Sequence, residues 1–247
     1  MDFSKYVRNS GAVNRIETIF DEGVFRMKEI RLKDIDKFVY DDRAGTEKAL
    51  VVFNGHCSVH LDSSGENYGL EERDLCYCPP GEGIKFAKLK GEPLIVIAEG
   101  KTDLRIGAYV KKFKEANGEI RGEVGFRRVV YSMLGENDPA GRLILGYTEG
   151  YSGEWTSYPP HKHDNMIEVY LYYGLGDSYG IQVIQHQNDI ETYAVRDWDA
   201  VLIRRGYHPN VSPPKCGINY LWVLYPLGKR ELRPETDPNY LGSSRSC

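Results

Sequence analysis

The sequence predicts an all-β protein made of two similar barrels in tandem. Its 247 residues suffice for two domains of ordinary size. Short runs of apolar, β-branched and aromatic residues alternate with turn residues along most of the chain, whereas helical periodicity is weak. A ten-residue pattern also recurs half a chain later. Together these observations favour a duplicated barrel or jelly roll.

The expected strands are short and are separated by glycine, proline, aspartate and asparagine. The 18 tyrosines suit half-buried strands, because the ring packs while the hydroxyl finds a polar partner. Only the first 20 residues could form a short amphipathic helix. The runs expected to be strands are residues 25–32, 48–53, 57–62, 74–80, 93–100, 142–150, 168–174, 179–186, 191–195, 200–205 and 218–225.

A repeat divides the chain into two halves. Asp74–Gly83 (DLCYCPPGEG) aligns without a gap over Asp199–His208 (DAVLIRRGYH), with the aspartate and one glycine in common. Because strand residues alternate faces, equal spacing predicts an equivalent strand and turn in each half. We therefore expect one barrel over residues 1–125 and another over residues 126–247. The alternative is a chance match of the two segments.

The C-terminal half contains a group of potential metal ligands. His161 and His163 are two positions apart, so on a strand both imidazoles point to one side. Glu168 has the opposite parity, and we expect a turn or bulge at residues 164–166 to return it to that side. His208 follows in a Gly-x-His at the end of a later strand. These could be ordinary core or surface histidines, but the order and spacing match the two-part signature of cupins.

This donor set suits one divalent transition metal. Three neutral imidazoles and a carboxylate favour Zn²⁺, Mn²⁺, Fe²⁺ or Ni²⁺ over Ca²⁺ or Mg²⁺. The N-terminal half has no His-x-His, and Gly83 stands where the repeat has His208. Its histidines, His56 and His60, are expected to be surface or packing residues. The first barrel should therefore be a degenerate copy without a metal.

The segments around the ligands resemble two related families of sugar-acid isomerases. GEWTSYPPHKHD (153–164), ETYAVRDWD (191–199) and RGYHP (205–209) are similar to blocks of the 5-deoxyglucuronate isomerases of inositol catabolism. EVYLY (168–172) and Leu221-Trp222 are closer to the 5-keto-4-deoxyuronate isomerases of pectin breakdown. The resemblance implies a bicupin fold and aldose–ketose isomerisation of a deoxyuronic sugar such as 5-deoxy-glucuronate. It also implies a metal in the second barrel, held by His161, His163, Glu168 and His208.

Side chains that share parity with the ligands should face the same cavity. The candidate catalytic residues are Glu168, Tyr172 and Gln182. The candidate substrate contacts are Tyr170, Arg205, Tyr220 and Trp222. Each could equally pack the barrel interior, and the base that moves the proton stays open between Glu168, a tyrosine and His186.

Recognition of a substrate carboxylate is the point at which the chain departs from the resemblance. The family places arginines near Tyr173 and at Val183, and arginine is a natural partner of a carboxylate. Arg205 and Lys162 are the remaining candidates that the sequence offers. Lys162 lies between two ligands and should therefore point away from them.

Composition limits the other partners. The net charge of −4, the pI near 5.9 and the lack of a long basic run argue against nucleic acid. No apolar run approaches the roughly 20 residues of a bilayer span. The start has no basic segment followed by an apolar stretch, so we expect a cytoplasmic protein. Five cysteines without a Cys-x-x-Cys suggest free thiols.

The expected protein is thus an isomerase that binds a small sugar acid. Family habit and exposed edge strands suggest a homo-oligomer. Two alternatives belong to other classes of cupin. A cupin dioxygenase would use similar ligands with Fe²⁺ and consume O₂, whereas a non-catalytic sugar-binding cupin would bind uronates without turnover.

Overall fold

The computed structural model describes residues 2–40 and 45–241, and these form an almost entirely β structure. Two short 3-10 helices, Phe113–Glu115 and Pro238–Tyr240, are the exceptions among the described residues. The all-β prediction is therefore confirmed. None of the helices in this part of the chain has the length and apolar character that a bilayer span requires.

The amphipathic helix considered for the first 20 residues is wrong. That segment forms strands β1 (Ser4–Val7) and β2 (Glu17–Asp21). β1 pairs antiparallel with β18 (Ala200–Ile203), about two hundred residues later in the chain. Pairing with a distant strand overrides a weak local preference, which is why the sequence pattern alone was misleading.

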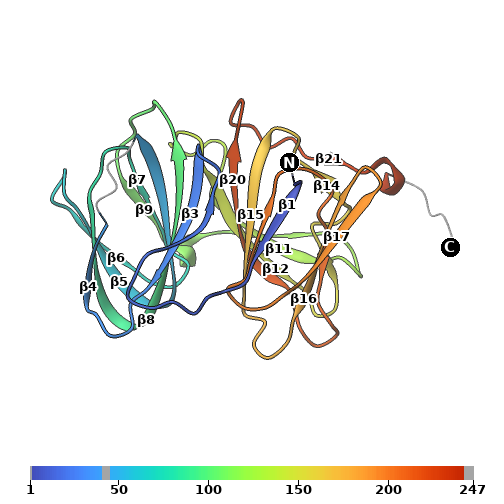
Figure 1. The fold of residues 1–247 in the computed structure, drawn as a ribbon, viewed down its shortest axis with the longest axis horizontal. Helices are drawn as coiled ribbons and strands as arrows, with labels where there is room; N and C mark the ends of the chain where they lie inside the picture. The colour runs from blue at the N-terminus through green and yellow to red at the C-terminus, as the bar shows by residue number, and fades with distance from the viewer. Residues whose placement is uncertain (1, 41–44, 242–247) are drawn as a thin grey trace. The chain divides into compact units, whose positions relative to one another are not determined.

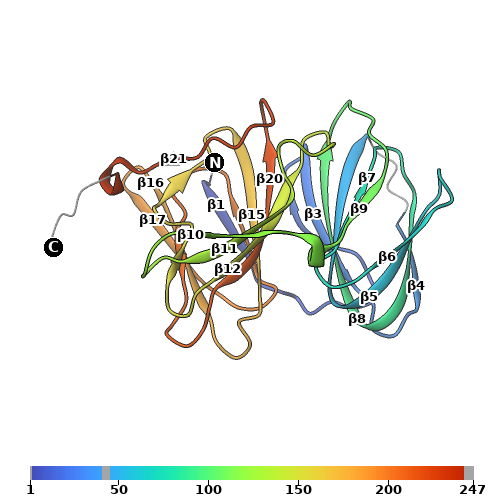
Figure 2. The ribbon, with the colours of Figure 1, turned by 180° about the vertical axis from the view of Figure 1, so that it is seen from behind.

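The chain forms two compact units, each discontinuous in sequence. The C-terminal unit comprises Met1–Asn9, Asn117–Ser132 and Leu145–Cys247, and the N-terminal unit comprises Ser10–Ala116 and Met133–Ile144. In Figures 1 and 2 the dark blue β1 accordingly lies among yellow and red strands. The boundary at residues 125 and 126, drawn along the chain, stays a prediction.

The C-terminal unit carries three sheets. The seven-stranded sheet has the order β1, β18, β15 (Met166–Tyr173), β20 (Asn219–Pro226), β12 (Ile144–Gly150), β11 (Arg128–Leu134) and β10 (Gly118–Arg121). The four-stranded sheet has the order β13 (Trp155–Thr156), β19 (Asn210–Val211), β16 (Gly180–His186) and β17 (Asp189–Val195). β14 (His161–Lys162) pairs with β21 (Glu235–Thr236) in a two-stranded sheet.

The N-terminal unit is built on one eight-stranded sheet. Its path is β2, β3 (Phe25–Arg31), β8 (Ile84–Lys101), β5 (Thr46–Leu61), β7 (Leu75–Cys78) and β9 (Tyr109–Lys111), with β4 (Lys37–Tyr40) on β8 and β6 (Asn67–Leu70) on β5. The sequence suggested two strands at 48–53 and 57–62, but β5 is continuous through both. It bulges at Asn54 and Gly55, where the register with β8 shifts. His56 and His60 lie on this strand, partly exposed, as expected.

The repeat seen in the sequence has a close structural counterpart. β7 and β18 are equivalent four-residue strands 125 positions apart, each preceded by a buried aspartate. Asp74 accepts a hydrogen bond from the Glu71 amide at 2.8 Å, and Asp199 accepts one from the Arg196 amide at 2.9 Å. The residues just before the aspartates, Arg73 and Trp198, also share a left-handed backbone, with φ of 66° and 70°. The same turn thus leads into the same strand in both units.

The free thiols lie mainly in the core of the N-terminal unit. Cys57, Cys76 and Cys78 are fully buried and unoxidised, and Cys216 is partly exposed. Cys76 and Cys78 project from one face of β7, with their sulfur atoms 3.8 Å apart. Cys247 lies outside the described residues.

Candidate metal centre

Local backbone geometry brings the histidine segment to the end of β15. Ser157 has a left-handed φ of 49°, and a cis Tyr158–Pro159 peptide follows it. β14 then carries His161, and the chain turns before β15 begins at Met166. The break expected at residues 164–166 thus falls between β14 and β15.

Three imidazoles converge beside a buried carboxylate. Ligand-type nitrogens of His161, His163 and His208 all lie within 4.8 Å of one another. Glu168 Oε2 lies 3.1 Å from His208 Nε2 and 3.9 Å from His163 Nε2. His208 and the Glu168 side chain are almost wholly inaccessible, at 1% and 6% exposure. The four residues expected from the sequence therefore lie together.

Hydrogen bonds on the outer side of two rings fix the nitrogens that face inward. His208 Nδ1 donates to the Gly206 carbonyl at 2.9 Å, and His161 Nδ1 donates to the Pro159 carbonyl at 3.3 Å. Their Nε2 lone pairs are then directed into the site, which is the usual arrangement of metal-bound histidine. Glu168 Oε2 and His208 Nε2 are buried and not aligned for a hydrogen bond to any described residue. Buried polar atoms rarely lack a partner, so this donor set fits a bound cation.

The protonation states of three of the four ligands also fit a metal. Burial lowers the pKa of His161 to about 3, and the neighbouring His208 and His163 lower it further. Burial likewise lowers the pKa of His163. For Glu168, burial raises the pKa, but the histidines outweigh that effect and leave it lowered. For His208, burial lowers the pKa, but Glu168 outweighs that effect and leaves it raised, so metal binding would have to displace a proton from this ring if it carries one. Neutral imidazoles and an ionised carboxylate are the forms that coordinate metal.

A buried layer of phenols and amides supports the ligands. Ser157 Oγ lies 2.7 Å from the Tyr170 hydroxyl and 3.2 Å from that of Tyr220. Tyr172 donates to Gln182 Oε1 at 2.5 Å, and Gln182 Nε2 donates to the His208 carbonyl at 2.9 Å. These residues are at most 4% exposed. The layer therefore holds the segment of His208 in place.

Other sequence candidates take different positions. Arg205 is exposed. Lys162 Nζ pairs with Asp164 at 2.8 Å and with Glu235 at 3.4 Å, so it points away from the ligands, as expected. His186, at the end of β16, packs on the Phe3 ring with 5.5 Å between centroids. Arg205 and Lys162 as contacts of the substrate carboxylate, and His186 as the base, stay predictions.

Several supporting residues were not singled out from the sequence. Ser157 links two phenols, and Asn210 Nδ2 donates to Gln182 Oε1 at 3.1 Å while accepting from Thr156. Trp222 was expected to contact substrate, and its ring lies against Gly146, where a Cβ atom would come within 2.3 Å of it. The only sequence signal for Ser157 was its place in the Ser-Tyr-Pro-Pro-His segment.

A pocket opens beside His163. It has a volume of about 330 Å³, within the range of small-molecule sites. Its charged lining contains three acidic and two basic residues. The full lining is His163, Asp164, Asn165, Met166, Gly228, Lys229, Glu231, Arg233 and Glu235.

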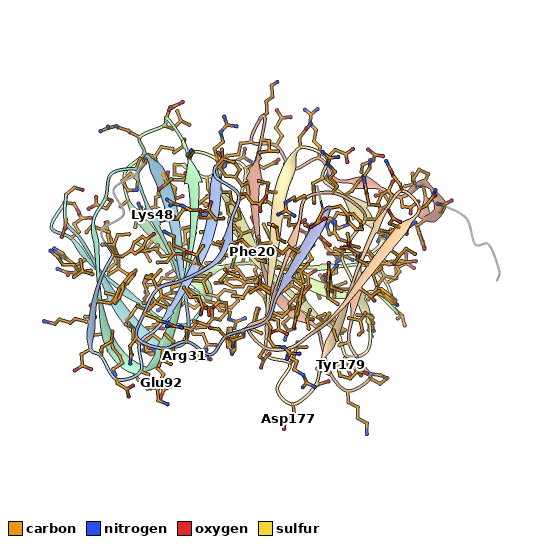
Figure 3. The ribbon with its side chains drawn as sticks, viewed as in Figure 1. Phe20, Arg31, Lys48, Glu92, Asp177 and Tyr179 are labelled. Carbon is orange, nitrogen blue, oxygen red and sulfur yellow. The ribbon has the colours of Figure 1, made fainter. Side chains whose placement is uncertain are left out.

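The equivalent place in the N-terminal unit is occupied differently. Cys78 pairs with Lys48 on β5, just as its repeat partner Ile203 pairs with Glu168 on β15. Lys48, labelled in Figure 3, therefore stands at the position of Glu168. Aliphatic side chains fill the neighbouring interior positions, namely Leu50, Val52, Ile95 and Ile97. Within the described residues, the three-histidine group belongs to the C-terminal unit.

The fold and this donor set define a cupin-type protein with a candidate metal centre. Solved structures agree on the fold. An IolB-like protein from Salmonella typhimurium superposes with a TM-score of 0.77 at 20% identity, over 88% of this chain and 89% of that one. Oxalate decarboxylase from Lactobacillus farciminis gives a TM-score of 0.61 at 11% identity, over 86% of this chain and 79% of that one.

The chain belongs to the KduI/IolB family, whose model matches residues 7–241. A relative named 5-deoxy-glucuronate isomerase, from Geobacillus thermodenitrificans, is 28% identical over 81% of this chain and 80% of its own length. Another of that name, from Bacillus subtilis subsp. natto, is 34% identical over 72% of this chain and 73% of its own length. This is a family of isomerases, so the enzyme class expected from the sequence is confirmed.

Proposed function

We propose that this isomerase interconverts the aldose and ketose forms of a deoxyuronic sugar at one divalent metal. 5-deoxy-glucuronate is the first candidate substrate, because relatives over most of the chain carry that name. The observation that carries the proposal is the convergence of three imidazoles on a buried carboxylate. His161, His163, Glu168 and His208 would hold the metal.

The donor set narrows the choice of metal to Zn²⁺, Mn²⁺, Fe²⁺ or Ni²⁺. Bound there, such an ion would act as a Lewis acid that polarises the sugar carbonyl and its neighbouring hydroxyl. The protein's own contribution is to keep His161 and His163 neutral and to turn the rings correctly. The hydrogen bonds from His161 to Pro159 and from His208 to Gly206 supply that orientation.

Isomerisation moves a proton between adjacent carbons, so the site needs a group that can carry it. Glu168 is ionised, so as a loosely held metal ligand its carboxylate is a candidate proton acceptor. Tyr172 and Gln182 bond each other, and Gln182 also holds the His208 carbonyl. Burial raises the pKa of Tyr172 well above its ordinary value, so it would act as a neutral hydroxyl. Tyr170 and Tyr220 would contact the sugar from the same layer.

The test is direct. Metal content of the purified protein is measured by elemental analysis, and 5-deoxy-glucuronate and 5-keto-4-deoxyuronate are each incubated with it and followed by NMR. Formation of the isomeric ketose or aldose, lost on chelation and restored by one metal equivalent, supports the proposal. Oxygen uptake with a sugar acid would point to a dioxygenase, and binding of uronates without turnover would point to a sugar-binding protein.

We also expect a cytoplasmic homo-oligomer. β10 ends the seven-stranded sheet and is exposed along its whole length, with Ile120 at 66% exposure. An unprotected edge strand of this kind favours pairing with another copy. Light scattering of the purified protein measures the molecular mass, and a monomer would contradict the expectation.

A further inference from the structure

Arg128, at the start of β11, is a half-buried cation in the C-terminal unit. Its Nη1 donates to the Phe126 carbonyl at 3.2 Å, and in the described part of the chain it has no acidic partner. Its neighbours differ in this respect. Arg127 forms hydrogen-bonded ion-pair contacts with Glu154, and Arg121 pairs with Glu119 at 2.6 Å. Burying a guanidinium without an anion costs free energy, so Arg128 is poised to receive one.

Two phenols relate Arg128 to the candidate metal centre. Burial lowers the pKa of Arg128, while the nearby phenols of Tyr220 and Tyr170 oppose that effect. The Tyr170 ring in turn lies 5.8 Å from the ring of His208, between centroids. These two phenols, which belong to the layer that supports a metal ligand, are therefore within electrostatic reach of the guanidinium.

A second contact path leads to the other ligands. The Phe126 ring, on the residue whose carbonyl holds Arg128, lies 5.2 Å from the ring of Tyr158. Tyr158 precedes His161 by three residues and continues into β14 through Pro159 and Pro160. Arg128 is thus linked to the ligand segment through Phe126 and Tyr158, and it lies within electrostatic reach of the Tyr170 and Tyr220 phenols.

We propose that Arg128 binds the carboxylate of the sugar acid while the other end of the sugar reaches the metal ligands. The inference rests on the proposed function. A guanidinium offers a planar fork that matches a carboxylate in a bidentate manner. In a six-carbon uronic acid, five carbon–carbon bonds of about 1.5 Å each separate the two ends by about 6 Å. Such a molecule is long enough to lie across the phenol layer.

The pocket beside His163 is the rival place for the carboxylate, and its charges argue against it. Asp164 and Glu235 are matched by Lys162, which lies outside the pocket lining. The Arg233 guanidinium pairs with Glu231 at 2.5 Å. An incoming carboxylate would meet three acidic side chains there and only Lys229 as an additional cation. Arg128 has no such competitors among the described residues.

The experiment compares a charged sugar with an uncharged one on the metal-loaded, full-length protein. The substrates are 5-deoxy-glucuronate and its primary amide, which differ only at the carboxylate. Arg128→Met should lower kcat/KM for the acid by about 10- to 100-fold, mainly through KM, as expected for loss of a charged hydrogen-bond pair. The amide should show no comparable loss. Arg128→Lys should recover part of the activity on the acid.

Controls separate this role from a structural one. Arg121→Met removes a nearby arginine that already has an acidic partner, and it should leave both substrates unaffected. Lys229→Met tests the rival pocket. Equal losses on acid and amide in a folded Arg128→Met or Arg128→Lys protein would overturn the inference. So would an acid-selective loss in Lys229→Met without one at Arg128.

Calorimetric binding of glucuronate distinguishes failure of this inference from failure of the proposed function. Wild-type protein that binds glucuronate through Arg128 but does not turn over 5-deoxy-glucuronate would refute the function and support the carboxylate site. Turnover that is insensitive to Arg128 would refute the site alone. Neither binding nor turnover of sugar acids would refute both.

Discussion

The paired aspartates of the repeat allow a quantitative test of how the metal-bearing unit is held together. Asp199 is 3% exposed and accepts three hydrogen bonds within the C-terminal unit. The donors are the Arg196 amide at 2.9 Å, the Asn9 amide at 2.8 Å and the Tyr6 hydroxyl at 2.9 Å. Asp199→Ala leaves all three without that acceptor. At about 1–1.5 kcal/mol for each bond, the free energy of unfolding should fall by about 3–5 kcal/mol.

That loss is a large share of the roughly 5–15 kcal/mol by which domains are stable. The assay is urea unfolding followed by tryptophan fluorescence, because Trp155, Trp198 and Trp222 are the chain's three tryptophans and all belong to the C-terminal unit. With a slope of about 1–3 kcal/mol per molar urea, the midpoint should fall by about 1 M or more. Asp199→Asn keeps one acceptor oxygen and should lose about half as much.

Asp74 is the matched control. It accepts from the Glu71 and Phe113 amides at 2.8 and 2.9 Å and from Lys112 at 2.7 Å, all within the N-terminal unit. Asp74→Ala should cost a similar free energy, read by far-ultraviolet circular dichroism, which reports on the strands of both units. A cost of less than about 1 kcal/mol for Asp199→Ala would refute the reasoning from hydrogen-bond count.

Three further predictions follow from single positions. Burial raises the pKa of Glu29 to about 7 from 4.5, so the stability gained from its protonated form is complete below pH 4.5 and is lost as the pH rises through 7. Glu29→Gln should therefore remove the fall in stability between pH 4.5 and 7 and stabilise the protein at pH 8 by up to about 3 kcal/mol. Thermal melts over this pH range measure the effect, and an unchanged profile would contradict the prediction. His163→Ala should abolish tight metal binding, whereas Lys162→Ala should retain it, and full metal occupancy of the His163 variant by elemental analysis would exclude His163 as an essential ligand. Gly146→Ala should destabilise the protein by roughly 1–3 kcal/mol or more in urea, because its Cβ would lie 2.1 Å from a backbone oxygen and 2.3 Å from the Trp222 ring; wild-type stability would show that the sheet yields there.

Much of the fold could be predicted because its longer strands are runs of apolar and aromatic residues bounded by turn residues. The predicted run 168–174 corresponds to Met166–Tyr173, and the run 218–225 corresponds to Asn219–Pro226. The spacing of the cupin signature also predicted that His161, His163 and His208 lie together. Their ligand nitrogens are within 4.8 Å of one another, although His163 and His208 are 45 positions apart in the sequence. These features depend on local runs of apolar and aromatic residues or on a motif with fixed spacing, and both are visible in one sequence.

Other features depend on partners that are distant in sequence. β1, β14 and β21 have two to four residues each, and they exist because β18 or each other supply hydrogen bonds. No local pattern of that length identifies a strand. Arg128 likewise sits in an Arg-Arg pair with no motif around it. Its lack of an acidic partner becomes evident only after folding has placed Arg127 beside Glu154 and Arg128 against the phenols.

The pairing of β1 with β18 limits when β1 can join its sheet during synthesis. β1 pairs with β18, whose residues are made nearly two hundred positions later. At about 5–20 residues per second, that interval is roughly 10–40 s. Ser4–Val7 must therefore remain without its native partner strand until Ala200–Ile203 have emerged. The seven-stranded sheet can therefore acquire its β1 edge only after β18 has emerged.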